Sequence, residues 1–169
     1  MCGRSFGSAH GGTFKAVYAY PHEHYATWQA EFSRDDFVMG QFGENFTVTG
    51  MLETEVYVGN IYRVGDAQVQ VTQPRVPCYK LGIRMNDPSF VKRFMQAERT
   101  GFYLRILQEG FVAANDEILL ESEDPQQMTV RDINHLLYFE SDPKLAEKAL
   151  KIEALSPGWR GSFESMLES

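Results

Sequence analysis

Short β-forming segments separated by glycine turns occupy the middle of this 169-residue chain. Residues 67–73 alternate between apolar and polar side chains, which is the period of a strand with one buried face. Turns at Gly59-Asn60 and Gly65-Asp66 bound the segment 61–64. We expect further strands over residues 14–20, 46–48, 56–58, 101–107, 110–113 and 117–121. Many short strands with closely spaced turns are typical of a β-sandwich or a β-barrel.

Helical patterns flank and follow these strands. Pro21 is suited to the first turn of a helix, and aromatic residues recur after it at three- to four-residue spacing. Asp142 and Pro143 have the residue types of an N-cap and a first helical position. We expect helices over residues 21–32, 87–99, 129–137, 142–150 and 157–167. The last three are too short to hold a core alone, so we expect a β domain at 1–123 and a three-helix extension at 124–169 that packs on it.

The charge of the chain limits the partners that it can bind. The net charge of −7 and the sequence pI of about 5.1 argue against general binding to nucleic-acid backbones. Residues 75–105 differ, because they contain seven basic and two acidic residues, a composition suited to a small anion or a phosphate group. No apolar stretch is long enough to span a bilayer, and residues 1–8 lack the apolar region of a secretory signal. We therefore expect a cytoplasmic protein without a membrane partner.

Cys78 is the residue best suited to carry chemistry. The chain has one other cysteine, so a disulfide framework is excluded. Pro74 and Pro77 restrict the backbone before Cys78, and the positive charges of Arg75 and Lys80 favour a thiolate, the form that binds metals or attacks electrophiles. Three uses remain open on these grounds: a metal ligand, a nucleophile paired with one of the four histidines, or an inert thiol. A zinc site is disfavoured because no second cysteine lies at close spacing.

Motifs around and before Cys78 carry a family resemblance. The chain contains FGENFTVTG at residues 42–50, VGN at 58–60 and VTQPRVPCYKL at 71–81. Together with His10-Gly11-Gly12, these motifs resemble the MOSC domain family, named after the C-terminal domain of molybdenum cofactor sulfurase. Residues 155–160, of sequence LSPGWR, resemble the three-helix extension of the YiiM-like bacterial subgroup.

The resemblance implies a mainly β fold with α-helices: a MOSC-type β-barrel of short strands with peripheral helices and the three-helix extension. It also implies a molybdenum cofactor (molybdopterin), with Cys78 as the metal ligand and catalytic residue. For the YiiM-like subgroup it implies reduction of N-hydroxylated bases such as N-hydroxylaminopurine to amines. Electrons would come from a separate reductase, a flavoprotein or an iron–sulphur protein, because no flavin or iron–sulphur motif is visible. The alternative is a non-redox carrier that holds the cofactor or a sulphur atom on Cys78.

The motifs also provide candidates for holding the cofactor. Arg75 and Lys80 are candidates for contacts to its phosphate, and His10-Gly11-Gly12 for a turn whose N–H groups cradle an anion. Asn45 is a candidate amide donor, and a structural role is the alternative for each of these residues. MOSC proteins normally have tens of residues before the HGG motif, whereas nine precede His10 here. We therefore expect exposed sheet edges, which pairing in a homodimer would cover.

Overall fold

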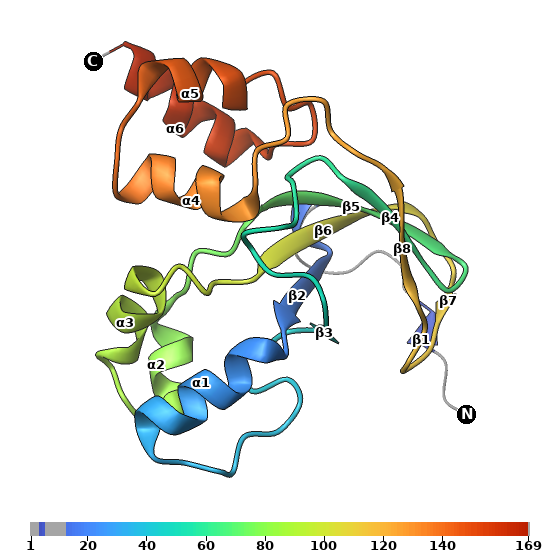
Figure 1. The fold of residues 1–169 in the computed structure, drawn as a ribbon, viewed down its shortest axis with the longest axis vertical. Coiled ribbons are helices and arrows are strands. Elements are labelled where there is room, and N and C mark those ends of the chain that lie inside the picture. The colour runs from blue at the N-terminus through green and yellow to red at the C-terminus, as the bar shows by residue number, and fades with distance from the viewer. Residues whose placement is uncertain (1–3, 6–12, 169) are drawn as a thin grey trace.

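The protein is built on one curled, mixed β-sheet, described by a computed structural model for residues 4–5 and 13–168 (Figure 1). The sheet has six strands in the order β3-β2-β6-β5-β4-β8. Their bounds are β2 Val17–Pro21, β3 Phe46–Val48, β4 Ile61–Val64, β5 Ala67–Pro74, β6 Phe102–Gln108 and β8 Ile118–Ser122. The β2–β3 pair is parallel and the other pairs are antiparallel. β1 (Arg4–Ser5) and β7 (Phe111–Val112) form a separate two-stranded sheet. The curled sheet is half a barrel, which confirms the expected fold class.

Two groups of helices lie at opposite ends of the sheet (Figure 1). The first group is α1 Glu23–Phe32, α2 Tyr79–Met85 and α3 Phe90–Gln96, and the second is α4 Val130–Tyr138, α5 Pro143–Ala149 and α6 Pro157–Leu167. A short 3-10 helix, η1 (Thr13–Lys15), precedes β2. Asp142 caps α5 as predicted, by accepting hydrogen bonds from the N–H groups of Lys144 and Leu145. None of the described helices is both long enough and apolar enough to cross a bilayer.

The sheet and the last three helices share one hydrophobic core. Val71 of β5 and Phe102 of β6 belong to the same buried cluster as Ile133 of α4 and Phe163 of α6, and all four are fully shielded from solvent. Burying a side chain of this size contributes about 1.5–3 kcal/mol. Apolar contacts therefore hold α4 and α6 against the sheet.

A second cluster, here called the aromatic cluster, fills the space between α1, β2 and the α2–α3 pair. Its rings include Tyr20, Trp28, Phe42, Phe90 and Phe94. Trp28 stacks on Phe94 with ring centroids 6.0 Å apart and meets Phe90 edge-on at 5.1 Å. This packing fixes α2 and α3 to the sheet.

Two predicted elements differ in the structure. Residues 56–58 are not a strand of the sheet, because Val58 N–H donates to the Met128 carbonyl (2.9 Å) and Val130 N–H donates to the Val56 carbonyl (2.8 Å). The segment therefore pairs with the start of α4. The helix expected over residues 87–99 is shorter, and α2, which the sequence pattern does not reveal, precedes it. Asn86 ends α2 in a left-handed conformation (φ 53°), and proline at position 88 disfavours helical backbone in the residue before it.

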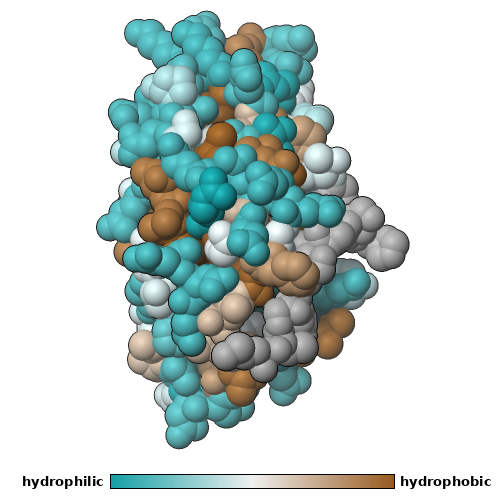
Figure 2. Space-filling model, turned by 90° about the vertical axis from the view of Figure 1, so that its right-hand side faces the viewer, coloured by the Kyte–Doolittle hydropathy of each residue, from teal (hydrophilic) through white to brown (hydrophobic). Residues whose placement is uncertain are grey.

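Apolar side chains are exposed on the strands that lie away from the helices. Figure 2 views this side of the molecule and shows apolar patches between hydrophilic side chains. The exposed apolar residues of β6, β7 and β8 are Leu107, Phe111, Leu119 and Leu120. Within the described part of the chain, β8 pairs with β4 alone, so it forms one edge of the six-stranded sheet. The homodimer that would cover such an edge stays a prediction.

Candidate functional site

Cys78 lies where the chain leaves the sheet and enters a helix. β5 ends at Pro74, and Cys78 is the N-cap residue of α2 with an extended backbone (φ −122°, ψ 172°). Its carbonyl oxygen accepts a hydrogen bond from Leu81 N–H (3.0 Å). Leu81 and Met85 bury one face of α2 in the aromatic cluster, whereas Cys78 is exposed. The core thus anchors the helix, and the helix start presents the thiol to solvent.

Arg75 is bound inside the protein beside this segment. Its Nη1 donates hydrogen bonds to the Tyr18 hydroxyl (3.0 Å) and to the Phe42 carbonyl (2.9 Å). Burial lowers the pKa of Arg75, but its interactions with Tyr18 and, more weakly, with Cys78 raise it, and the net pKa lies above its usual value. Arg75 therefore keeps its positive charge three residues before Cys78. The contact from Arg75 to a cofactor phosphate stays a prediction.

The FGEN motif, residues 42–45, is held next to Arg75 by hydrogen bonds of its own side chains. Asn45 mimics a strand partner, because its Oδ1 accepts from Tyr18 N–H (2.8 Å) and its own N–H donates to the Tyr18 carbonyl (2.8 Å). The buried Glu44 carboxylate accepts from the N–H groups of Gly40 (3.2 Å) and Phe42 (3.0 Å) and from the Tyr25 hydroxyl. These contacts fix the Phe42 carbonyl that holds Arg75. Among the described residues, no hydrogen bond from the Asn45 side-chain N–H groups is seen.

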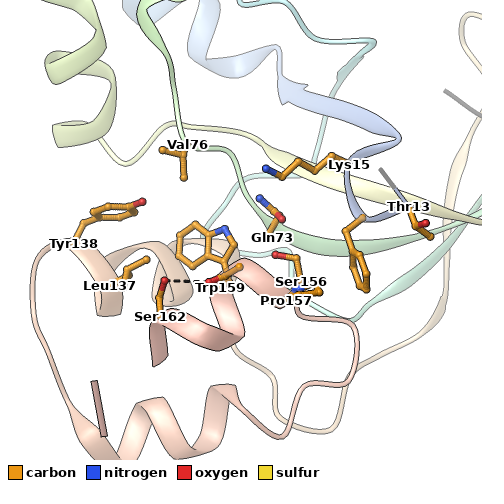
Figure 3. A pocket seen from close by; sticks show the side chains of 12 residues that line it. Thr13, Lys15, Gln73, Val76, Leu137, Tyr138, Ser156, Pro157, Trp159 and Ser162 are labelled. Carbon is orange, nitrogen blue, oxygen red and sulfur yellow. Dashed lines mark hydrogen bonds between the residues drawn. The ribbon is translucent and has the colours of Figure 1, made fainter. Parts of the chain in front are cut away.

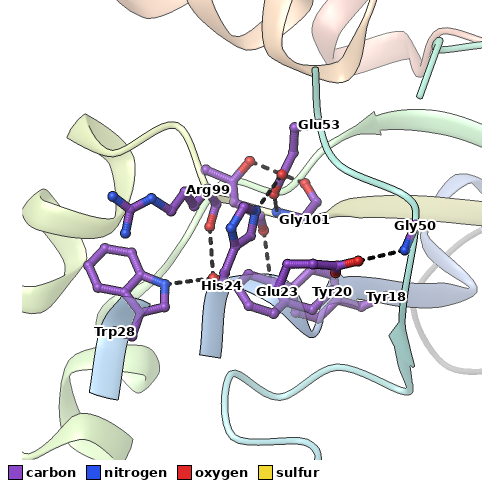
Figure 4. Close-up of polar contacts among 10 residues, drawn as sticks. Tyr18, Tyr20, Glu23, His24, Trp28, Gly50, Glu53, Arg99 and Gly101 are labelled. Atoms are coloured by element: carbon purple, nitrogen blue, oxygen red, sulfur yellow. Dashed lines mark hydrogen bonds and ion pairs between the residues drawn. The ribbon is translucent and has the colours of Figure 1, made fainter. Parts of the chain in front are cut away.

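A second polar network supports the turn before β6 (Figure 4). Gly101 N–H donates to Glu53 Oε1 (2.7 Å), and Glu53 Oε2 lies 2.6 Å from His24 Nε2. The Gly101 carbonyl accepts from Arg75 N–H (3.2 Å). Tyr20 donates to the Arg99 carbonyl (3.1 Å). Buried side chains thus hold the turn against which the segment before Cys78 lies.

A pocket of about 420 Å³ opens on the other side of this segment, between η1, the end of β5 and helices α4 and α6 (Figure 3). Val76, two residues before Cys78, is one of its lining residues. Lys15 and Gln73 line it from the sheet side, while Ser156 and Trp159 face them from α6. The pocket and the exposed thiol therefore share one short segment of chain.

The polar groups of this pocket have unused hydrogen-bonding capacity. Gln73 is 2% exposed, and among the residues that the structure describes its Oε1 has no hydrogen-bond partner. Ser156 is the N-cap of the 11-residue α6, yet its hydroxyl makes no capping hydrogen bond. Within the described residues, Lys15 forms no ion pair, and its ammonium group lies 5.8 Å from the ring centroid of Tyr103. The pocket therefore offers a buried acceptor on one side and, from Lys15 and the positive end of α6, a favourable environment for an anion.

The structure brings together only part of the predicted site. Arg75 and Asn45 both contact Tyr18, whereas Cys78 is the exposed N-cap residue of α2 and Lys80 is exposed in the first turn of that helix. His10-Gly11-Gly12 lies outside the described residues, although Thr13, the next residue, lines the pocket. In the part of the chain that is described, no group of three or more His, Cys, Asp or Glu residues could hold a metal ion.

Sequence reasoning missed the pocket residues Lys15, Gln73, Ser156 and Trp159. Gln73 belongs to the VTQPRVPCYKL motif, and Ser156 precedes an expected helix, so each had a local signal. The missing information was that η1 and the start of α6 meet across the end of β5. That contact depends on how the extension packs against the sheet.

Comparisons with known proteins cover both parts of the chain. A family model described as MOSC domain matches residues 7–119, and one described as YiiM-like, 3-alpha helix domain matches residues 128–169. The chain is 40% identical over 155 residues to the uncharacterized protein YflK of Bacillus subtilis, covering 91% of this chain and 70% of YflK. The crystal structure of YiiM from Geobacillus stearothermophilus superposes with a TM-score of 0.93 at 36% identity, over 98% of this chain and 85% of that one. A Gibberella moniliformis protein named Reductase is 39% identical over 123 residues, which are 70% of this chain and 22% of that protein.

Proposed function

We propose a function from the premise that this chain belongs to the MOSC domain family and carries a YiiM-like three-helix domain. In this proposal, Cys78 is the protein ligand of a molybdenum cofactor, and the protein reduces N-hydroxylated bases such as N-hydroxylaminopurine to amines in the cytoplasm. The observation that carries the proposal is the exposed Cys78 thiol two residues after Val76, which lines a pocket with unused polar groups.

The pocket residues fit the chemistry of a pterin cofactor. A pterin ring carries N–H donors, and the unpartnered Gln73 Oε1 is a buried acceptor that needs one. The cofactor also carries a phosphate, for which Lys15, the Ser156 hydroxyl and the N-terminus of α6 are suitable partners. We therefore assign the pterin to Gln73 and the phosphate to Lys15 and Ser156. Arg75, Lys80, Asn45 and His10-Gly11-Gly12 remain proposed contacts.

A residue near Cys78 would favour the binding of molybdenum to the Cys78 sulphur. Arg75, three residues before Cys78, would place a positive charge near a metal-bound thiolate. When bound, the cofactor would supply the two-electron chemistry that converts an N–OH group to an N–H group with release of water. The electrons would come from a separate flavoprotein or iron–sulphur reductase.

The exposure of Cys78 also supports a second candidate function. A thiol at the surface is accessible to another protein, which suits a carrier that delivers the cofactor or a sulphur atom. Such a carrier would bind molybdenum or form a persulfide without turning over N-hydroxylated bases.

The test is turnover of N-hydroxylaminopurine by molybdenum-loaded protein with a supplied chemical reductant. We expect formation of the amine by the wild type and by Cys2→Ser, and none by Cys78→Ser. Loaded wild-type protein without turnover would overturn the reductase function and favour the carrier. A persulfide on Cys78 in mass spectra of molybdenum-free protein would identify a sulphur carrier.

A further inference from the structure

We propose that the outer face of α2 and α3 is the docking surface for a small acidic electron-carrier protein, which delivers electrons next to Cys78. This inference rests on the proposed reductase function and adds the surface and the charge of the partner. The α2–α3 surface, as we call it, consists of an apolar groove and the exposed cations that follow its lining residues in the sequence. The groove is lined by Tyr79, Gly82, Ile83, Asn86, Pro88 and Val91.

Large apolar side chains lie open to solvent along this groove. Tyr79 is 70% exposed and Ile83 is 71% exposed. They are four residues apart on α2, so they lie on the same face of the helix. The groove that they border has a volume of about 580 Å³. An aromatic and an aliphatic side chain beside a hollow are typical of the centre of a protein interface.

The groove has a fixed shape because α2 and α3 are packed tightly. At Gly82, a Cβ atom would lie only 3.1 Å from the Cα of Pro88, so the two segments approach closely. The opposite faces of the helices are buried through Leu81, Phe90 and Phe94. A partner would meet a preformed surface, which lowers the entropic cost of association.

Three cations near the groove have no acidic partner. Lys80 and Arg84 directly follow Tyr79 and Ile83, and Lys92 directly follows Val91. All three are exposed, and within the described residues none of them forms an ion pair.

Unlike these three cations, two neighbouring arginines form ion pairs: Arg99 with Glu31 (2.9 Å) and Arg93 with Asp87 (3.7 Å). Unpaired cations around an apolar centre complement an acidic protein surface and speed its association.

The position of the surface argues for an electron carrier as the occupant. Tyr79 and Lys80 are the first two residues of α2, and Cys78 is its N-cap, so the Tyr79 end of this surface directly follows Cys78 in the chain. A reductase of this type needs a donor that can approach its metal site. A second copy of this chain would itself need an electron donor, so it could not be the source of the electrons.

The test uses a purified flavodoxin, a small acidic flavoprotein, as the probe. Its binding to the full chain is measured by calorimetry at about 20 mM and about 200 mM salt. Arg84→Glu/Lys92→Glu is compared with Lys144→Glu/Lys148→Glu, which makes the same charge change on α5. Lys80 is left intact because it is a proposed cofactor contact. We expect the α2–α3 variant to bind at least about tenfold more weakly at low salt, and the control to stay within about twofold of wild type.

A second variant, Ile83→Ser, tests the apolar groove. We expect about tenfold weaker flavodoxin binding at both salt concentrations, since the loss is not electrostatic. Three results would overturn the inference: no flavodoxin binding at low salt, equal losses in both charge variants, or occupation of the surface by something else. The last would appear as a dimer that Ile83→Ser dissociates, or as binding to phosphatidylglycerol vesicles that Arg84→Glu/Lys92→Glu abolishes.

Binding is measured independently of molybdenum content, so the two proposals can fail separately. Molybdenum-loaded protein that turns over substrate but does not bind flavodoxin would reject the docking surface alone. Flavodoxin binding by protein that never acquires molybdenum would support the surface and reject the proposed function.

Discussion

The guanidinium group of Arg75 lies over the ring of Tyr18, 4.4 Å from the ring centroid, and donates a hydrogen bond to its hydroxyl. Arg75 is three residues before Cys78, and Tyr18 is in β2. The same guanidinium donates to the carbonyl of Phe42 in the FGEN motif. One half-buried side chain therefore connects the two motifs that carry the family resemblance and holds the segment of Cys78 where it leaves the sheet.

Arg75→Lys is expected to destabilise the protein by about 1–3 kcal/mol, because lysine keeps the charge but cannot reproduce the stacked, forked contact with Tyr18 and Phe42. Urea unfolding measures the loss. Arg34→Lys is the matched control, since Arg34 pairs with Asp36 at the surface and its replacement should cost much less than that of Arg75. Similar losses in both variants would contradict the anchoring role of Arg75.

Gly101→Ala is expected to cost more than about 2 kcal/mol of unfolding free energy. Gly101 has φ +68°, and a Cβ there would lie 2.5 Å from the Ala19 carbonyl oxygen. Gly161→Ala is the control, because Gly161 is inside α6 with no atom near its Cβ position and should gain about 0.5–1 kcal/mol. Thermal unfolding of both variants checks the prediction, which fails if Gly101→Ala is as stable as wild type.

Gln73→Met is expected to change stability and molybdenum content in opposite directions. The substitution removes a buried acceptor that has no partner, so the metal-free protein is expected to gain about 1 kcal/mol of stability. The molybdenum content of the same variant is expected to fall, because the pterin loses its acceptor. Gln108→Met, at an exposed position, should leave both quantities unchanged. Full molybdenum content in Gln73→Met would remove Gln73 from the proposed site.

The Tyr25–Glu44 contact predicts a dependence of stability on alkaline pH. Burial, together with the hydrogen bond to Glu44 and its charge, raises the pKa of Tyr25 to about 12. The folded state therefore favours the neutral phenol. Its contribution is complete below the unfolded-state pKa of about 10 and declines as the pH rises from there toward the folded-state value.

Wild type is accordingly expected to lose stability relative to Tyr25→Phe as the pH rises from about 9 to about 11. Unfolding free energies of the two proteins at each pH provide the measurement. A difference that stays constant over this range would show that Tyr25 titrates like a free tyrosine.

The sequence predicted the strands and helices that depend on local patterns. Residues 67–73 alternate as a strand with one buried face should, and they form most of β5. Asp142 and Pro143 begin α5 as their residue types indicate. The segment 56–58 has the composition of a strand, but its backbone partners are Met128 and Val130 in a distant part of the chain. A local sequence pattern cannot predict hydrogen bonds between segments that are so far apart in the chain.

Site residues that belong to a local sequence motif could be predicted from the sequence. Site residues that come together only through the packing of distant elements could not. Cys78 stood out through its prolines and positive neighbours. The inward orientation of Arg75 was not visible, because it depends on Tyr18 and Phe42. Lys15 and Ser156 lie far apart in the sequence and line one pocket only because α6 packs beside η1.

The most direct test of the account is the molybdenum content per chain of protein made in cells that synthesise the cofactor. We predict near-stoichiometric molybdenum in wild type and in Cys2→Ser, and its loss in Cys78→Ser with the fold intact by circular dichroism. Well-folded wild-type protein without molybdenum, or a Cys78→Ser variant that retains it fully, would contradict the assignment of Cys78 as the metal ligand.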